Sequence, residues 1–151
     1  MNKFGKGMAA GLVATIVLSA LMVMKMLMGV MPELDLPKMI TGMMGMPDQP
    51  LVGWAIHFMI GVVLYGVAMA LLDTRLPGHS SVGHGILIAV AGWALMMVML
   101  MPMAGAGLFG MKMGTIAPMM TLVLHLIFGA VLGWVYERSI DKGRSGRLAR
   151  G

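Results

Sequence analysis

Two histidines, His57 and His125, are the side chains of this sequence best suited to chemistry, because each lies inside a long apolar stretch. A polar group in such surroundings is costly unless it is satisfied, so it often marks a functional site. Two neutral imidazoles that face one another could ligate the iron of a b-type haem from both sides. The alternative is that each histidine hydrogen-bonds across a helix bundle or relays protons. The sequence leaves both interpretations open.

A glycine follows each histidine by four residues, Gly61 after His57 and Gly129 after His125. Residues four apart share one face of a helix, and a bare backbone beside each histidine would let a flat macrocycle approach. We therefore include both glycines in the candidate haem site. The alternative is that they allow close helix packing, as the small-residue spacing of Gly129 and Gly133 indicates.

Methionine is unusually frequent, at 22 of 151 residues. Met97, Met99, Met101 and Met103 form i, i+4 pairs toward the end of the third apolar stretch. Thioethers are soft ligands that select Cu(I), so these four residues are a candidate copper site. Methionine is also an adaptable apolar filler, and that is the alternative interpretation.

Three further polar residues have less specific roles. Lys25, near the end of the first apolar stretch, could extend its ammonium group to the lipid headgroups. Otherwise it pairs with a carboxylate such as Glu33, or with an anion bound in the bundle. No acidic residue lies deep in an apolar stretch, so the acidic ion-coupling site of many transporters is not expected. His79 and His84 flank a short polar link, and we expect them to be solvated or interfacial rather than metal ligands.

Four apolar stretches must position these side chains, and they run roughly over residues 7–30, 51–72, 82–104 and 115–136. Each supplies the roughly 20 apolar residues that a membrane-spanning helix needs. Inside hydrocarbon the backbone must satisfy its own hydrogen bonds, which favours helices. Hydrophobic residues make up 59% of the chain and charged residues 11%. The sequence therefore predicts an all-α polytopic membrane protein, a single bundle of four transmembrane helices in residues 1–151.

The net charge of +5 comes from basic residues gathered at the two ends of the chain. Lys3 and Lys6 precede the first stretch, and the tail of residues 137–151 contains Arg138, Lys142, Arg144, Arg147 and Arg150. Basic flanks favour the cytoplasmic side, so both termini are expected there. The tail is expected to contact lipid headgroups, and nucleic acid is not an expected partner.

The chain also contains an apparent repeat of a helical hairpin. Residues 57–67 and 125–135 share five of eleven positions without a gap, at an offset of 68 residues. The segment Ala-Leu-Met at residues 20–22 recurs at residues 94–96, at an offset of 74. The difference of six residues would be absorbed by the longer first connection. Both hairpins then enter the membrane with the same orientation, as a parallel repeat.

Residues 101–110, Met-Pro-Met-Ala-Gly-Ala-Gly-Leu-Phe-Gly, and 124–133, Leu-His-Leu-Ile-Phe-Gly-Ala-Val-Leu-Gly, resemble segments of small four-helix bacterial membrane proteins. Those proteins are grouped as a domain of unknown function, and the resemblance covers nearly the whole chain. It implies four spans in a bacterial inner membrane. It implies no activity and no site residues.

The sequence contains no Ser-His-Asp ordering, no phosphate-binding loop and no cysteine, so we do not expect an autonomous enzyme. The leading expectation is a non-catalytic membrane subunit or accessory protein that packs against a larger membrane complex or its own copies. An alternative is a b-haem electron-transfer protein that uses His57 and His125. A third is a small carrier or channel for copper or another small solute.

Overall fold

The computed structural model describes the backbone of residues 2–78 and 80–148, with side chains up to residue 141. Four helical segments in this part are long and apolar enough to cross a membrane, which confirms the predicted all-α fold class with four such helices. The first is α1 (Lys3–Leu27) and the fourth is α7 (Ile116–Leu148). The second consists of α3 (Pro50–Met59), the π-helical turn η1 (Ile60–Tyr65) and α4 (Gly66–Leu72). The third consists of α5 (Ser81–Leu95), the π-helical turn η2 (Met96–Leu100) and α6 (Met101–Met103). The connections hold α2 (Leu36–Met43) and the 3-10 helix η3 (Leu108–Met113).

Two of these helices extend beyond the expected spans. Helix α1 begins at Lys3 because the Oδ1 atom of Asn2 accepts a hydrogen bond from the Gly5 N–H at 2.8 Å, which caps the first turn. Helix α7 does not stop at Tyr136 but continues through the basic segment to Leu148. Part of the expected tail is therefore helical, and residues 149–151 lie outside the described residues.

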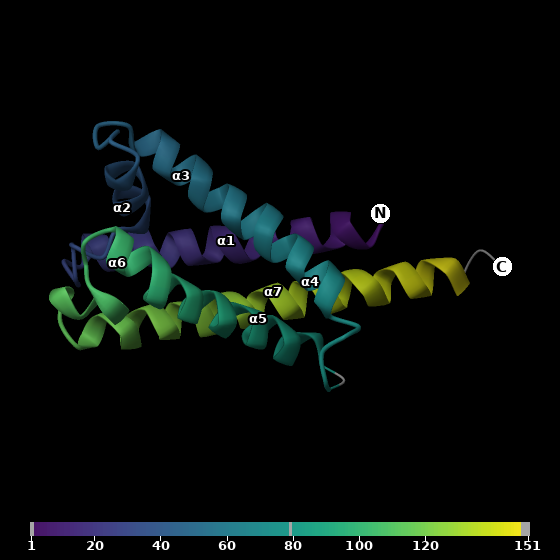
Figure 1. The fold of residues 1–151 in the computed structure, drawn as a ribbon. Coiled ribbons are helices and arrows are strands. Elements are labelled where there is room, and N and C mark those ends of the chain that lie inside the picture. Colours follow the sequence, from purple (N-terminus) through teal and green to yellow (C-terminus); the bar gives the residue numbers. More distant parts are fainter. Residues whose placement is uncertain (1, 79, 149–151) are drawn as a thin grey trace.

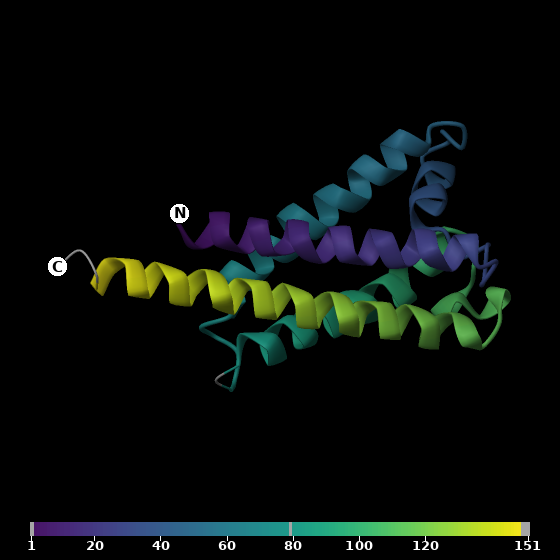
Figure 2. The same ribbon diagram turned by 180° about the vertical axis from the view of Figure 1, so that it is seen from behind.

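The start of α1 and the end of α7 lie at one end of the bundle, and α2, α6 and η3 lie at the other (Figures 1 and 2). Helix α7 packs along both α1 and α5. Both ends of the described chain are therefore on the same side of the bundle, as the clustered basic flanks require. That this side is cytoplasmic stays a prediction.

Close glycine contacts hold each hairpin together. In the first hairpin, Gly11 of α1 lies so near Gly61 that a Cβ on Gly11 would overlap the Gly61 carbonyl oxygen. In the second, a Cβ on Gly85 of α5 would overlap the Gly129 carbonyl oxygen of α7. These are equivalent positions of the repeat, because the offset of 74 residues relates Gly11 to Gly85 and the offset of 68 residues relates Gly61 to Gly129. Small residues let helix backbones approach in this way within lipid, and the shared contact supports the repeat.

The π-helical turn η1 accounts for a difference in spacing between the hairpins. The first hairpin has a second close pair, Gly7 with Gly66, and in the second hairpin Gly133 packs against the Ser81 carbonyl. Glycines 61 and 66 are five residues apart, whereas glycines 129 and 133 are four apart. A π-helical turn has an i→i+5 hydrogen-bond pattern, so five residues there span what four span in α7.

The short helix α2 breaks the symmetry of the two hairpins. The Asp35 side chain caps α2 by accepting from the Lys38 N–H at 3.1 Å. Gly53 of α3 packs directly against the Pro37 carbonyl of α2, and α2 lies between α1 and the start of α3 (Figure 1). This packing keeps the beginning of α3 away from α1.

Candidate functional site

A cavity of about 450 Å³ lies between α3–η1 and α5–η2, with α1 and α7 behind it. Its walls are mostly apolar, and its volume falls in the range that holds a drug-sized ligand. Five of its lining side chains are also exposed on the outside of the bundle: Met43, Leu64, Leu95, Met99 and Met103. On membrane-spanning helices such a rim faces lipid, so the cavity opens sideways into the bilayer.

Both predicted histidines line this cavity, His57 from α3 and His125 from α7. His57 is only 4% exposed, and its Nε2 atom lies 3.3 Å from the Ser19 hydroxyl of α1. The rings of Trp54 and Phe58 contact the His57 ring edge-on, with centroids 5.7 and 5.9 Å away. His57 is therefore held in place by α1 and its own helix.

His125 is oriented differently, because its partner is a backbone carbonyl. Its Nδ1 atom lies 2.8 Å from the Thr121 carbonyl oxygen, one turn earlier in α7. A carbonyl oxygen can only accept, so Nδ1 carries the proton and donates. In the neutral ring Nε2 is then an acceptor, and no described residue donates a hydrogen bond to it. This arrangement prepares Nε2 for a ligand, as in histidines that bind metals.

Tyr65 is a third polar residue of the cavity, and sequence reasoning missed it. Its hydroxyl lies against Gly92 of α5, where a Cβ would overlap the hydroxyl oxygen. Its ring packs edge-to-face on Phe128 of α7, with the centroids 4.9 Å apart. The available signal was a tyrosine in the middle of a span, one residue before Gly66 in the repeat segment.

The two π-helical segments, η1 and η2, border opposite sides of the cavity. Proline 102 gives a reason for η2, because it lacks an N–H and its ring would clash with the carbonyl four residues earlier. The preceding turn widens instead, and the Met101 N–H bonds to the Met96 carbonyl five residues back. Such π turns are frequent at functional sites.

Neighbouring helices fill the space beside the two glycines of the candidate haem site. The Cβ direction of Gly61 is filled by the Thr15 side chain of α1, and Gly61 borders the cavity only beside it. The Cβ direction of Gly129 is filled by Gly85 and Ala89 of α5, and Gly129 does not line the cavity. The geometry thus fits the alternative of close helix packing.

The four methionines of the candidate copper site fall on two different sides of their helix. Met97 and Met101 are each 1% exposed and pack in a buried cluster with Ala106. Met99 and Met103 are 55% and 74% exposed and lie at the rim of the cavity. The structure therefore brings together each i, i+4 pair but does not gather the four sulfur atoms into one site.

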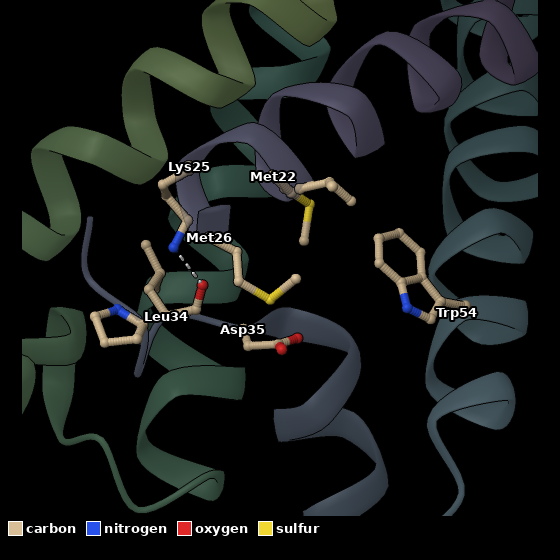
Figure 3. A pocket seen from close by; sticks show the side chains of 8 residues that line it. Met22, Lys25, Met26, Leu34, Asp35 and Trp54 are labelled. Carbon is tan, nitrogen blue, oxygen red and sulfur yellow. Dashed lines mark hydrogen bonds between the residues drawn. The ribbon is translucent and has the colours of Figure 1, made fainter. Parts of the chain in front are cut away.

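Lys25 neither reaches out to lipid nor meets a carboxylate. Its ammonium donates to the carbonyl oxygens of Val30, Met31 and Leu34 at 3.1, 2.8 and 3.0 Å. Figure 3 shows the Lys25 side chain directed at Leu34, with Asp35 farther along the chain. An ammonium group has three N–H donors, so all of them serve the loop after α1. Lys25 is therefore a structural residue of this loop.

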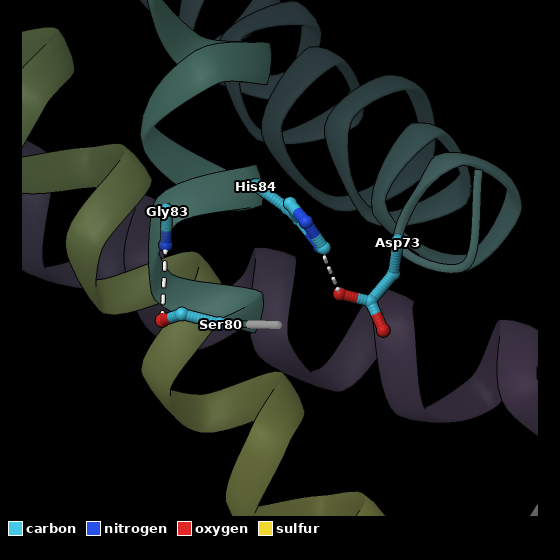
Figure 4. Close-up of polar contacts among 4 residues, drawn as sticks. All are labelled: Asp73, Ser80, Gly83 and His84. Atoms are coloured by element: carbon cyan, nitrogen blue, oxygen red, sulfur yellow. Dashed lines mark hydrogen bonds and ion pairs between the residues drawn. The ribbon is translucent and has the colours of Figure 1, made fainter. Parts of the chain in front are cut away.

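The expectation that His84 is solvated is wrong, and its position at a membrane interface stays a prediction. His84 is 6% exposed, and its Nδ1 atom lies 2.9 Å from an oxygen of Asp73, which follows α4 (Figure 4). Its Nε2 atom is buried without a hydrogen-bond partner in the described part of the chain. The link between α4 and α5 is short enough to fold the start of α5 onto Asp73. His79, expected to behave like His84, lies outside the described residues.

The chain belongs to the family of unknown function DUF6789, whose sequence pattern matches residues 1–145. No curated protein and no solved structure matches the chain. The family match and the four candidate spans confirm the resemblance to small four-helix membrane proteins of a family without an assigned role.

Proposed function

We propose that this protein is a non-catalytic integral membrane protein that binds an apolar ligand in the cavity between α3–η1 and α5–η2. The observation that carries the proposal is the cavity itself, about 450 Å³ in volume and lined by His57, Tyr65 and His125 among apolar side chains. A large apolar pocket with a few convergent polar groups is the expected form of a small-molecule site. Its rim faces the bilayer, so a ligand dissolved in lipid can enter from the side.

This proposal is separate from the accessory role that the sequence predicts, and the two roles are compatible. We place the protein in a bacterial inner membrane with both termini in the cytoplasm, on the strength of the basic flanks and their common end of the bundle. Packing against a larger membrane complex, or against further copies of the chain, stays a prediction. Co-purification with a stoichiometric partner after gentle solubilisation would test that prediction.

The ligand-binding proposal is tested by filling the cavity. Ala68 of α4 lines the cavity, so the substitution Ala68→Phe should occupy part of it. Ala55 of α3 is exposed on the outside of the bundle, so Ala55→Phe is a matched control in the same span. The measurement is mass spectrometry of small molecules extracted from each purified protein.

We expect a bound apolar compound in the wild type and in A55F, and a loss of about tenfold or more in A68F, as steric exclusion removes the site. Equal amounts in the two variants, or no bound compound together with no binding of an apolar fluorescent probe, would overturn the proposal.

A second candidate is a b-type haem, favoured by the position of both histidines on one cavity. His125 fits an axial ligand, because Nδ1 is held by Thr121 and Nε2 is free of protein donors. His57 fits less well, because its Nε2 contacts Ser19 and would have to leave that contact. A haem held there would supply one-electron transfer.

The haem candidate is tested by a reduced-minus-oxidised absorption spectrum of protein produced with adequate haem. Sharp α and Soret bands that disappear on replacing either histidine with alanine would support it. A featureless spectrum would remove haem from consideration and leave the apolar ligand.

A further inference from the structure

We infer that the ligand of the cavity carries a hydroxyl group, and that this hydroxyl donates a hydrogen bond to Nε2 of His125. The inference rests on the proposed function, because it describes the polar end of the ligand bound in the same cavity. An aliphatic alcohol of the lipid phase and a quinol share this chemistry.

The first argument is the fixed direction of the His125 ring. The Thr121 carbonyl takes the Nδ1 proton at 2.8 Å, so Nε2 presents a lone pair. A protonated ring would place an unpaired charge beside an apolar cavity, which is costly, so we take the ring as neutral. A ligand that offers only a carbonyl or ether oxygen then has nothing to donate to Nε2. A ligand hydroxyl does.

The second argument is the position of Tyr65. The Tyr65 ring contacts Phe128 with centroids 4.9 Å apart, and Phe128 lies three residues after His125 on one face of α7. The Tyr65 hydroxyl, on the same cavity, has no hydrogen-bond partner among the described residues. A ligand hydroxyl both donates and accepts. It can therefore donate to His125 Nε2, and its oxygen stays available to accept from a donor such as the Tyr65 hydroxyl.

The third argument is that the other imidazole of the cavity is already engaged. His57 Nε2 lies 3.3 Å from the Ser19 hydroxyl, so the protein itself supplies a hydroxyl to that ring. His125 has no such neighbour among the described residues and needs one from a ligand. Apart from Thr15, whose hydroxyl donates to the Gly11 carbonyl, the remaining walls are apolar and fit a hydrocarbon body.

The experiment compares 1-dodecanol with dodecyl methyl ether, which has the same chain but carries a methyl group in place of the hydroxyl proton. Each is titrated against the full-length protein in mild detergent carrying an apolar fluorescent probe. We expect the alcohol to displace the probe at about five- to tenfold lower concentration, the effect of one hydrogen bond. In His125→Phe the two compounds should become equal, while Ala55→Phe keeps the wild-type preference. A short-chain quinol in a parallel arm identifies the source, since the tighter-binding of the two hydroxyl compounds resembles the natural ligand.

A second measurement guards against a variant that fails to fold. In ¹⁵N-histidine-labelled wild type, the alcohol should shift the Nε2 resonance of His125 and the ether should leave it unchanged. Equal displacement by alcohol and ether in the wild type overturns the hydroxyl inference but leaves cavity binding intact. A preference that survives in His125→Phe overturns the assignment to His125. Displacement by neither compound, with no extracted ligand, overturns the proposed function itself.

Discussion

The glycine contact between α5 and α7 leads to a quantitative prediction about Gly85. A Cβ on Gly85 would overlap the Gly129 carbonyl oxygen and the Gly133 nitrogen. Both are backbone atoms, so the neighbour cannot yield by rotating a side chain. The helices must separate, and overpacking of this kind costs about 1–3 kcal/mol. Gly85→Ala should therefore destabilise the bundle although alanine is the better helix former.

Gly83 provides the matched control, since it lies two residues away in the same helix. The nearest atom to a Cβ on Gly83 is the Cβ of Ser80 at 4.0 Å, an ordinary distance. Gly83→Ala should thus be neutral or stabilise the helix by up to about 1 kcal/mol. The two variants should therefore differ by about 1–4 kcal/mol in free energy of unfolding.

The assay is equilibrium unfolding in mixed micelles, followed by far-UV circular dichroism and tryptophan fluorescence. Gly11→Ala, at the equivalent position of the first hairpin, should behave like Gly85→Ala because its Cβ would meet the Gly61 carbonyl. If Gly85→Ala proved as stable as Gly83→Ala, the close contact between α5 and α7 would be refuted.

Three other predictions concern polar contacts and topology. Lys25→Met should lower the free energy of unfolding by about 1–3 kcal/mol, because three carbonyls lose their donor. Lys38 is exposed, so Lys38→Met should change the free energy of unfolding by less than about 0.5 kcal/mol. Equal effects of the two substitutions would contradict the role of Lys25 in the loop. A double-mutant cycle with Asp73→Leu and His84→Leu should give a coupling of about 0.5–3 kcal/mol, and additive effects would show that the pair at 2.9 Å contributes nothing. Because the chain has no cysteine, single cysteines added before Met1, after the last residue and at Asp48 can be labelled cleanly with a membrane-impermeant maleimide. The two terminal cysteines should react from the cytoplasmic side and the third from the opposite side, and labelling of the termini from opposite sides would contradict the fold.

The four spans were predictable because crossing a membrane depends on local quantities, the length and apolarity of a stretch. The pairing of Gly11 with Gly61 was also within reach, since repeats and small-residue spacings are visible in the sequence. The division of the methionines could have been anticipated, because residues two apart in a helix differ by about 200° in direction. Met97 and Met99 accordingly lie on different sides.

Other parts of the site depend on contacts between distant segments. The burial of His84 follows from where Asp73 lies after α4, and neither residue has a local pattern that indicates the pairing. The Tyr65 hydroxyl lies on the cavity because Gly92, on another helix, leaves room for it. The Nε2 atom of His125 has no donor because no described residue of a neighbouring helix supplies one. Periodicity and spacing carry no information on these contacts.

The cavity itself arises from the way the two hairpins differ. Both cross at equivalent glycines, but the second hairpin makes its contacts, Gly85 with Gly129 and Ser81 with Gly133, within the regular helices α5 and α7. In the first hairpin, α2 packs on α3 through Gly53 and holds its start away from α1. The π turn η1 accommodates one extra residue between the start of α3, which diverges from α1, and the contact of Gly66 with Gly7.

A symmetric duplication would bring α3 as close to α1 along its whole length as α7 is to α5. The inserted connection prevents this at one end only, so the space opens where His57, Tyr65 and His125 converge. The six-residue difference between the two repeat offsets lies in the segment that contains α2. We therefore expect that shortening this connection by six residues would close the cavity and abolish ligand extraction while the glycine contacts persist. Retention of the ligand in such a variant would show that α2 is not what holds the site open.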